Sequence, residues 1–220
     1  GLGLQLRILD TSSYSYTGTA TGLDQYLTTG LLSQTPIYSG TGTPDLDVNP
    51  QGSGNHGSNV PAAALTASGD VKDSLWMYSG YLLPKVSGSY TFSFDADDNG
   101  RIYIGSGAQT KSVSSWVNDG AAKTLTVELS AGEVVPIWVF FKSQPEGGYW
   151  ADWVKLKWQL PGTSGFTAIP VEQMVPMSDT LVPSNAGYPT DLLPFDTGSG
   201  ALNLASTQVS GSPAFVALDT

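Results

Sequence analysis

The chain has 220 residues, 40% of them hydrophobic, which is enough to bury one substantial core. Its 19 acidic and 9 basic side chains give a formal net charge of −10, so its average surface repels nucleic acid and anionic membranes. The sequence contains no cysteine, which excludes disulfides, thiolate chemistry and cysteine-ligated metals. Charged residues make up only 13% of the chain, a composition typical of β-rich extracellular modules.

The first part of the chain, residues 1–66, is mostly loop-like. Leucine and isoleucine alternate with other residues over positions 2–8, which predicts an edge or closing strand. The segment NPQGSGNHGSNVP, residues 49–61, has no periodicity and predicts an exposed loop. It holds the only histidine, His56, which we leave unassigned because metal and acid–base roles both need partner residues.

An alternation of apolar and polar residues then runs from residue 74 to residue 160. It predicts strands at residues 90–94, 102–104, 125–129, 135–141 and 154–158. Turn-forming residues lie between them, including Ala131-Gly132, and no segment has a convincing helical period. We therefore predict an all-β fold, an antiparallel β-sandwich of lectin-like type.

The last part of the chain is rich in Ser, Thr, Gly and Pro, with weak strand-like segments at residues 201–205 and 213–218. We expect one domain over residues 1–176 and an ordered Ser/Thr/Pro-rich C-terminal extension or linker over residues 177–220. No apolar run of 18 residues occurs, so we expect no membrane insertion. No charged-then-apolar leader opens the sequence, so we expect a soluble piece of a larger protein.

The densest group of oxygen ligands is DADDNG, residues 95–100. An EF-hand is excluded because its twelfth position would be Ser106 and strand-like residues flank the loop on both sides. A glycosidase site is disfavoured because adjacent carboxylates either point apart or lie closer than the roughly 5 Å that hydrolysis needs. Two converging carboxylates at Asp97 and Asp98 repel each other unless a divalent ion lies between them, and calcium suits such oxygen ligands.

Three stretches resemble the protective-antigen-type (PA-fourteen) β-sandwich domain. They are SGYLLPKVSGSYTFSFDADDNGRIYIG (79–105), PIWVFFKS (136–143) and GGYWADWVKLKWQLPG (147–162). The resemblance covers roughly residues 1–176 and is strongest over residues 74–162. It is to the lectin branch, which includes yeast flocculins, epithelial adhesins and giant bacterial (RTX-type) adhesins.

The resemblance implies a calcium site. In the lectin branch two adjacent aspartates joined by a cis peptide bind Ca2+, which places Asp97 and Asp98 as ligands. A second calcium-binding loop precedes the penultimate strand and corresponds to residues 143–150, where Gln144 would supply a side-chain oxygen. Yeast members usually have Asn at this position. The alternative, in which these residues form only a hairpin turn, stays open.

The remaining ligands of the second loop are less defined. The resemblance implies backbone carbonyls at Glu146 and Gly148, but Glu146 could instead bind through its carboxylate, or Gly147 could offer its carbonyl. Two coordination positions would remain for vicinal hydroxyls of a pyranose, which Asp97, Asp98 and Gln144 would contact. Tyr149 and Trp150 are placed to border the sugar, although aromatic residues at this density more often pack in the core. Trp116 and Asn118 are weaker candidates in a neighbouring loop.

We therefore predict a calcium-dependent carbohydrate-binding domain of a secreted or cell-surface adhesin, acting in cell adhesion or biofilm attachment. Its partners would be cell-surface or extracellular glycans, and it would be a monomeric module of a larger adhesin. With one histidine, no cysteine and no nucleophile elbow, we expect no catalytic residues and no enzyme activity. The alternative is a non-lectin structural or protein-binding module. The acidic, cysteine-free composition favours a bacterial origin.

Overall fold

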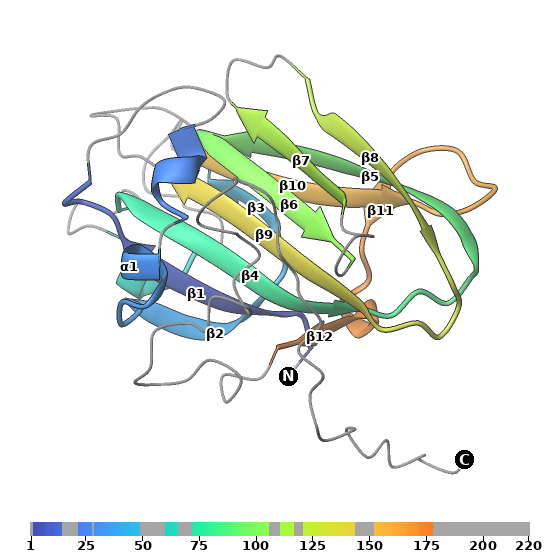
Figure 1. Cartoon of the computed structure of the whole chain (residues 1–220), viewed down its shortest axis with the longest axis horizontal. Helices are drawn as coiled ribbons and strands as arrows, with labels where there is room; N and C mark the ends of the chain where they lie inside the picture. Colours follow the sequence, from blue (N-terminus) through green and yellow to red (C-terminus); the bar gives the residue numbers. More distant parts are fainter. Residues whose placement is uncertain are drawn as a thin grey trace, which may run out of the picture.

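The computed structural model describes residues 2–14, 22–27, 29–48, 60–65, 72–105, 111–116, 121–143 and 152–177. Within these ranges the strands form two sheets, and every strand pair is antiparallel. Figure 1 shows sheet A across the front of the molecule, with sheet B behind it. The predicted antiparallel, lectin-like β-sandwich is confirmed.

Sheet A has the spatial order β2-β1-β4-β9-β6-β7, and β12 pairs with the end of β4. Its strands are β1 (Leu4–Asp10), β2 (Tyr38–Gly42), β4 (Ser74–Leu82), β6 (Asn99–Ile104), β7 (Lys111–Trp116), β9 (Val135–Ser143) and β12 (Met174–Pro176). The strand predicted at residues 2–8 is confirmed as β1, but its predicted edge position is wrong. It lies between β2 and β4, and the sequence YSGTG of β2 has no apolar alternation that could have revealed this partner.

Sheet B has the order β11-β10-β5-β8, and β3 pairs with the first half of β10. Its strands are β3 (Asp45–Val48), β5 (Gly88–Asp97), β8 (Lys123–Leu129), β10 (Asp152–Gln159) and β11 (Thr167–Ala168). The predicted turn at Ala131-Gly132 is confirmed. The Glu133 N–H donates to the Ser130 carbonyl at 3.1 Å, and Gly132 has a φ of 79° that glycine adopts without strain.

Aromatic and branched side chains fill the space between the sheets. Every second residue of β5 points into this core, from Tyr90 to Ala96, and each is 0% exposed. The Tyr90 ring packs on Trp158 of β10 with centroids 5.2 Å apart and planes tilted by 49°. Sheet A contributes Trp76 and Phe141, whose centroids are 6.0 Å apart. The buried apolar area is the main stabilising contribution to the fold.

A second apolar cluster covers the outer face of sheet A. It is formed by the short helices η1 (Gly22–Gln25) and α1 (Thr29–Leu32) with the residues beside them, which Figure 1 shows in front of the sheet. Its buried members are Leu9, Leu23, Tyr26, Leu27, Leu31, Leu32, Leu75, Met77, Tyr103, Trp138 and Phe140. The central strands β4 and β9 are therefore buried on both faces.

Two further 3-10 turns, η2 (Ala62–Ala64) and η5 (Val171–Gln173), complete the described elements. No helix in the described ranges is long and apolar enough to cross a membrane. Residues 178–220 lie outside the described part, so the domain boundary at residue 176 and the C-terminal extension stay predictions. His56 and most of the predicted loop at residues 49–61 also lie outside it.

Candidate functional site

The two adjacent aspartates lie where the chain leaves one sheet and enters the other. Strand β5 ends in sheet B at Asp97, and β6 begins in sheet A at Asn99, so only Asp98 lies between the sheets. The Asp97–Asp98 peptide bond is cis, as the resemblance implied. Because the chain changes sheet here, both aspartates lie at the seam between the sheets, at one end of the sandwich.

Backbone hydrogen bonds hold Asp98 at this seam. Its N–H donates to the carbonyl of Lys142 at 3.3 Å, and the next residue, Asn99, pairs with Lys142 across β6 and β9. Asp98 is 7% exposed, whereas Asp97 is half-buried. A carboxylate with so little access to water requires donors or a cation nearby, so the position suits an oxygen-binding metal ion.

On the sheet B side, Asp97 lies opposite Trp153 of β10. Residues directly opposite on antiparallel strands place their side chains on the same face. The ammonium group of Lys155 lies over the Trp153 ring, 5.5 Å from its centroid. Neither Trp153 nor Lys155 was predicted as a site residue, because the alternation over residues 153–158 indicated only a strand.

The strands on either side of the predicted second loop begin and end beside the aspartates. Lys142, near the end of β9, pairs with Asn99 in sheet A, and Trp153, near the start of β10, pairs with Asp97 in sheet B. The ends of the two strands that flank residues 144–151 therefore lie at the same seam as the aspartates. This placement brings the flanks of the two predicted calcium-binding loops together.

Most predicted residues of the second loop lie outside the described part of the chain. These are Gln144, Glu146, Gly147, Gly148, Tyr149 and Trp150, together with Asn118. Trp116 ends β7, and its backbone pairs with Asn99 at the start of β6. The predicted roles of the second-loop residues, Asn118 and Trp116 as metal ligands or sugar contacts stay predictions.

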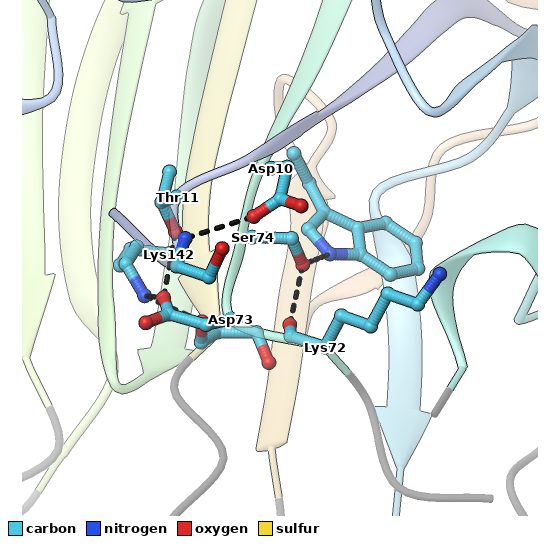
Figure 2. A network of polar contacts seen from close by, with 9 residues as sticks. Asp10, Thr11, Lys72, Asp73, Ser74 and Lys142 are labelled. Carbon is cyan, nitrogen blue, oxygen red and sulfur yellow. Dashed lines mark hydrogen bonds and ion pairs between the residues drawn. The ribbon is translucent and has the colours of Figure 1, made fainter. Parts of the chain in front are cut away.

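A buried polar network lies beside the seam, on the outer face of sheet A (Figure 2). The ammonium group of Lys142, 0% exposed, forms an ion pair with Asp73 and donates a hydrogen bond to the Ser143 carbonyl at 2.6 Å. The Thr11 hydroxyl donates to Asp73 Oδ1 at 2.6 Å, and the Thr11 N–H donates to the Asp73 carbonyl at 3.0 Å. This network fixes the ends of β1, β4 and β9 to one another.

Hydrogen bonds at the edge of this network order the chain around it. The Trp76 indole N–H donates to Ser74 Oγ at 2.9 Å, and the Ser74 hydroxyl donates to the Lys72 carbonyl at 2.7 Å, as Figure 2 shows. Hydrogen bonds from Ser12 hold the pKa of the Asp10 carboxyl below its ordinary value. Asp10 is therefore ionised at neutral pH.

Tyr26, which follows η1, packs against the Lys142 end of this network. Its side chain is 0% exposed, and the Lys142 ammonium lies 5.2 Å from the centroid of its ring. Burial, together with the smaller effect of the negative charges of Asp73 and Asp98, raises the pKa of the Tyr26 phenol to about 12. Tyr26 is thus a neutral phenol close to both carboxylates.

Lys142 and Asp73 were missed by the sequence analysis. The one available signal was a lysine in the otherwise apolar run PIWVFFKS, since a charge in a strand buried on both faces needs a partner. That partner lies 69 residues away along the chain, and sequence spacing alone does not reveal it.

The described residues alone do not form a complete metal site. Among them, no group of three or more His, Cys, Asp or Glu side chains is arranged to hold a metal ion. Asp97 and Asp98 supply two carboxylates, which are hard oxygen donors of the kind that calcium prefers. These two carboxylates fit calcium in chemistry.

Comparisons with known proteins agree with this fold. Residues 74–152, which include both aspartates and the segment after β9, match the GLEYA domain. The A domain of epithelial adhesin 6 from Candida glabrata, in complex with Galb1-3GlcNAc, is 21% identical with a TM-score of 0.54. The match covers 79% of this chain and 85% of that one. The PA14 domain of the MpAFP antifreeze protein is 18% identical with a TM-score of 0.51, over 79% and 90% of the two chains.

An anti-sigma factor domain-containing protein from Clostridium clariflavum shares the fold at 18% identity, with a TM-score of 0.53. The match covers 80% of this chain but only 48% of that protein, so this chain spans about half of its length. A search of the curated proteins finds no match. The fold is a lectin-like β-sandwich, and the resemblance to the lectin branch of the PA14 domains is confirmed.

Proposed function

We propose that this chain is a calcium-dependent carbohydrate-binding domain of a secreted or cell-surface adhesin. The observation that carries the proposal is the Asp97–Asp98 step at the seam, with both flanks of residues 144–151 beside it. A fold shared with adhesin A domains supports a carbohydrate-binding role, because one such domain is described in complex with Galb1-3GlcNAc.

Calcium would be held by oxygen atoms from both loops. Asp97 and Asp98 would give carboxylates, and Gln144 would give its side-chain oxygen, with Glu146, Gly147 or Gly148 completing the protein ligands. Calcium takes about six to eight oxygen ligands, so positions remain for two vicinal hydroxyls of a pyranose. The ion would thereby fix the orientation of a sugar diol at the end of the sandwich.

Protein side chains would add to the recognition of the sugar. Asp97, Asp98 and Gln144 would accept hydrogen bonds from hydroxyls, and Tyr149 and Trp150 would border the ring. We further propose that the domain is not an enzyme. Glycoside hydrolysis places two carboxyl groups at least about 5 Å apart on either side of the scissile bond, whereas Asp97 and Asp98 are adjacent at one seam.

In its biological setting, such a domain would act outside the cell, on cell-surface or extracellular glycans. Cell adhesion or biofilm attachment would follow from binding without bond cleavage, with this domain as a monomeric module of a larger adhesin. A bacterial origin stays a prediction from composition.

The decisive experiment is a glycan array probed with the domain in millimolar calcium and again with chelator. We expect binding that chelator abolishes. Asp97→Asn and Asp98→Asn should each abolish it, whereas the matched control Asp95→Asn, two residues earlier on β5, should retain it. Retained binding in the Asp97→Asn/Asp98→Asn double variant would overturn the proposed site.

A blank array in both conditions would favour the alternative of a structural spacer or protein-binding module. The preferred sugar is not fixed by the fold, because it depends on the residues that surround the diol. The same array would identify it.

A further inference from the structure

The polar network on sheet A forms a row that ends at the proposed calcium site. From β1 to β6 the members of this row are Thr11, Asp73, Lys142 and Asn99. Lys142 points to the outer face, where Trp138 and Phe140 of the same strand are also buried under the η1 and α1 cover. Its backbone carbonyl accepts the hydrogen bond from Asp98. The row therefore connects the outer face of sheet A to Asp98.

Packing alone does not explain a charged pair at this position. Lys142 is 0% exposed and Asp73 is 20% exposed, so both charges lose hydration when the chain folds. An apolar residue in place of Lys142 would continue the Trp138 and Phe140 pattern, and replacing buried ion pairs by apolar side chains is often neutral for stability. A buried pair of this kind instead fixes positions, since each partner has to meet the other.

The contacts of Lys142 show which positions it fixes. Its carbonyl receives the Asp98 N–H at 3.3 Å, which sets where Asp98 lies. Its ammonium donates to the carbonyl of Ser143 at 2.6 Å, and Ser143 is the last residue of β9 before the proposed second calcium loop. Asp73 in turn holds the ammonium. Lys142 thus contacts Asp98 through its backbone carbonyl, and its side chain, held by Asp73, contacts the last residue of β9 before the proposed second loop.

We propose that the Asp73–Lys142 ion pair is a positioning element of the calcium site. Neither side chain touches the ion; together they set the position of Asp98 and of the β9 end, so that ligands from two loops converge. This inference rests on the proposed calcium-dependent function.

Two neutralising substitutions distinguish positioning from simple electrostatics. Lys142→Met removes a positive charge near the site, and Asp73→Asn removes a negative one, so a purely electrostatic role predicts opposite changes in calcium affinity. A positioning role predicts that both variants weaken calcium binding. We expect a loss of about 10–100-fold in each, the usual effect of removing a group that orients metal ligands.

The first measurement is calcium binding by titration calorimetry on the full chain. Lys157→Met is the matched chemical control, because Lys157 is exposed on sheet B. Leu82→Ala is the control for stability, because Leu82 is buried at the opposite end of β4. Both controls should keep the wild-type calcium affinity, although Leu82→Ala lowers the melting temperature. Opposite shifts in Lys142→Met and Asp73→Asn, or wild-type affinity in both, would overturn the proposal.

The second measurement needs no calcium. Hydrogen exchange of the Asp98 amide in chelator reports directly on its bond to the Lys142 carbonyl. We expect faster exchange at Asp98 in both variants, beyond the change at the core amide of Leu156, and no such difference in Leu82→Ala. Unchanged protection at Asp98 would overturn the positioning role. A wild-type chain that binds no calcium would refute the proposed function, whereas wild-type binding with unaffected variants would refute this inference alone.

Discussion

The two sheets of the sandwich meet the same core from opposite sides but differ on their outer faces. In sheet B, strands β5 and β8 alternate between core-facing and more exposed residues. In sheet A, strands β4 and β9 are buried on both faces, because η1, α1 and the residues beside them cover the outer side. One sheet is thus open to solvent, and the other is a central layer.

This difference determines what a polar residue does in each sheet. A lysine on the outer face of sheet B, such as Lys157, is exposed to water. Lys142 on the outer face of sheet A has no access to water and is held by Asp73 and the Ser143 carbonyl. The same residue type is therefore a solubilising surface group in one sheet and part of a fixed polar network in the other.

The largest expected effect compares the same substitution on the two sheets. Lys142→Met should destabilise the calcium-free protein by about 2–3 kcal/mol, because it leaves the partly buried Asp73 carboxylate without its ion-pair partner. Lys157→Met should change stability by less than about 0.5 kcal/mol. Urea unfolding in chelator measures both. Equal midpoints for the two variants would contradict the distinction between the sheets.

The double variant Asp73→Asn/Lys142→Met sharpens this comparison. It leaves no uncompensated charge, so it should recover part of the loss seen in Lys142→Met. A double variant as unstable as the sum of its single variants would mean that the two side chains act independently.

The exposure of one face of sheet B made several of its strands predictable from the sequence. Period-two alternation identified β5, β8 and β10, because their outer residues are more polar than their core residues. Strands β2 and β3 were not predicted, since YSGTG and DLDV carry too few apolar residues and pair through tertiary context. The cover on sheet A was also missed, because residues 1–66 lack a long periodic segment.

The candidate site also has a part that the local sequence predicted and a part that depends on tertiary contacts. Asp97 and Asp98 were found because acidic residues are concentrated in one short segment, and the resemblance gave them a role. The Asp73–Lys142 pair depends on strand pairing between segments 69 residues apart, which no local pattern encodes. The change of sheet after Asp97 was likewise not predicted, since two strands joined by a short loop usually form a hairpin in one sheet.

The next prediction concerns the close packing around Gly100, two residues after Asp98. A Cβ at Gly100 would lie 2.5 Å from the Ala96 Cβ and 2.6 Å from the Phe94 Cζ, in the core between the sheets. Gly100→Ala should therefore destabilise by about 1–3 kcal/mol through overpacking. At Gly42 the nearest atom, of Leu6, is at 3.4 Å, so Gly42→Ala should be close to neutral. Thermal unfolding of both variants tests this, and comparable melting temperatures would contradict tight packing at the seam.

Tyr26 tests the sheet A cover at alkaline pH. Its pKa is raised from 10.0 to about 12 in the folded chain, so the stability from its neutral form is complete below pH 10 and is lost as the pH rises through about 12. Tyr26→Phe should reduce this loss. At pH 7 its effect should be small or stabilising by up to about 1 kcal/mol, because the buried hydroxyl has no hydrogen-bond partner among the described residues. Urea unfolding at pH 7 and pH 11 measures both effects, and identical losses in wild type and variant would contradict the burial of this phenol.

The smallest effect compares two glycines that both have open space around a new Cβ. Gly30 lies in α1 of the sheet A cover, and Gly162 lies in the turn after β10 with a φ of 71°. Gly30→Ala should stabilise by about 0.4–1 kcal/mol, because alanine restricts the unfolded chain and favours the helix. Gly162→Ala should destabilise, because alanine is strained at this backbone angle. Neither new Cβ would contact neighbouring atoms, so backbone conformation alone should set the sign of each change in the free energy of unfolding. Urea unfolding measures both changes. Changes of the same sign would contradict the backbone conformation at one of the two positions.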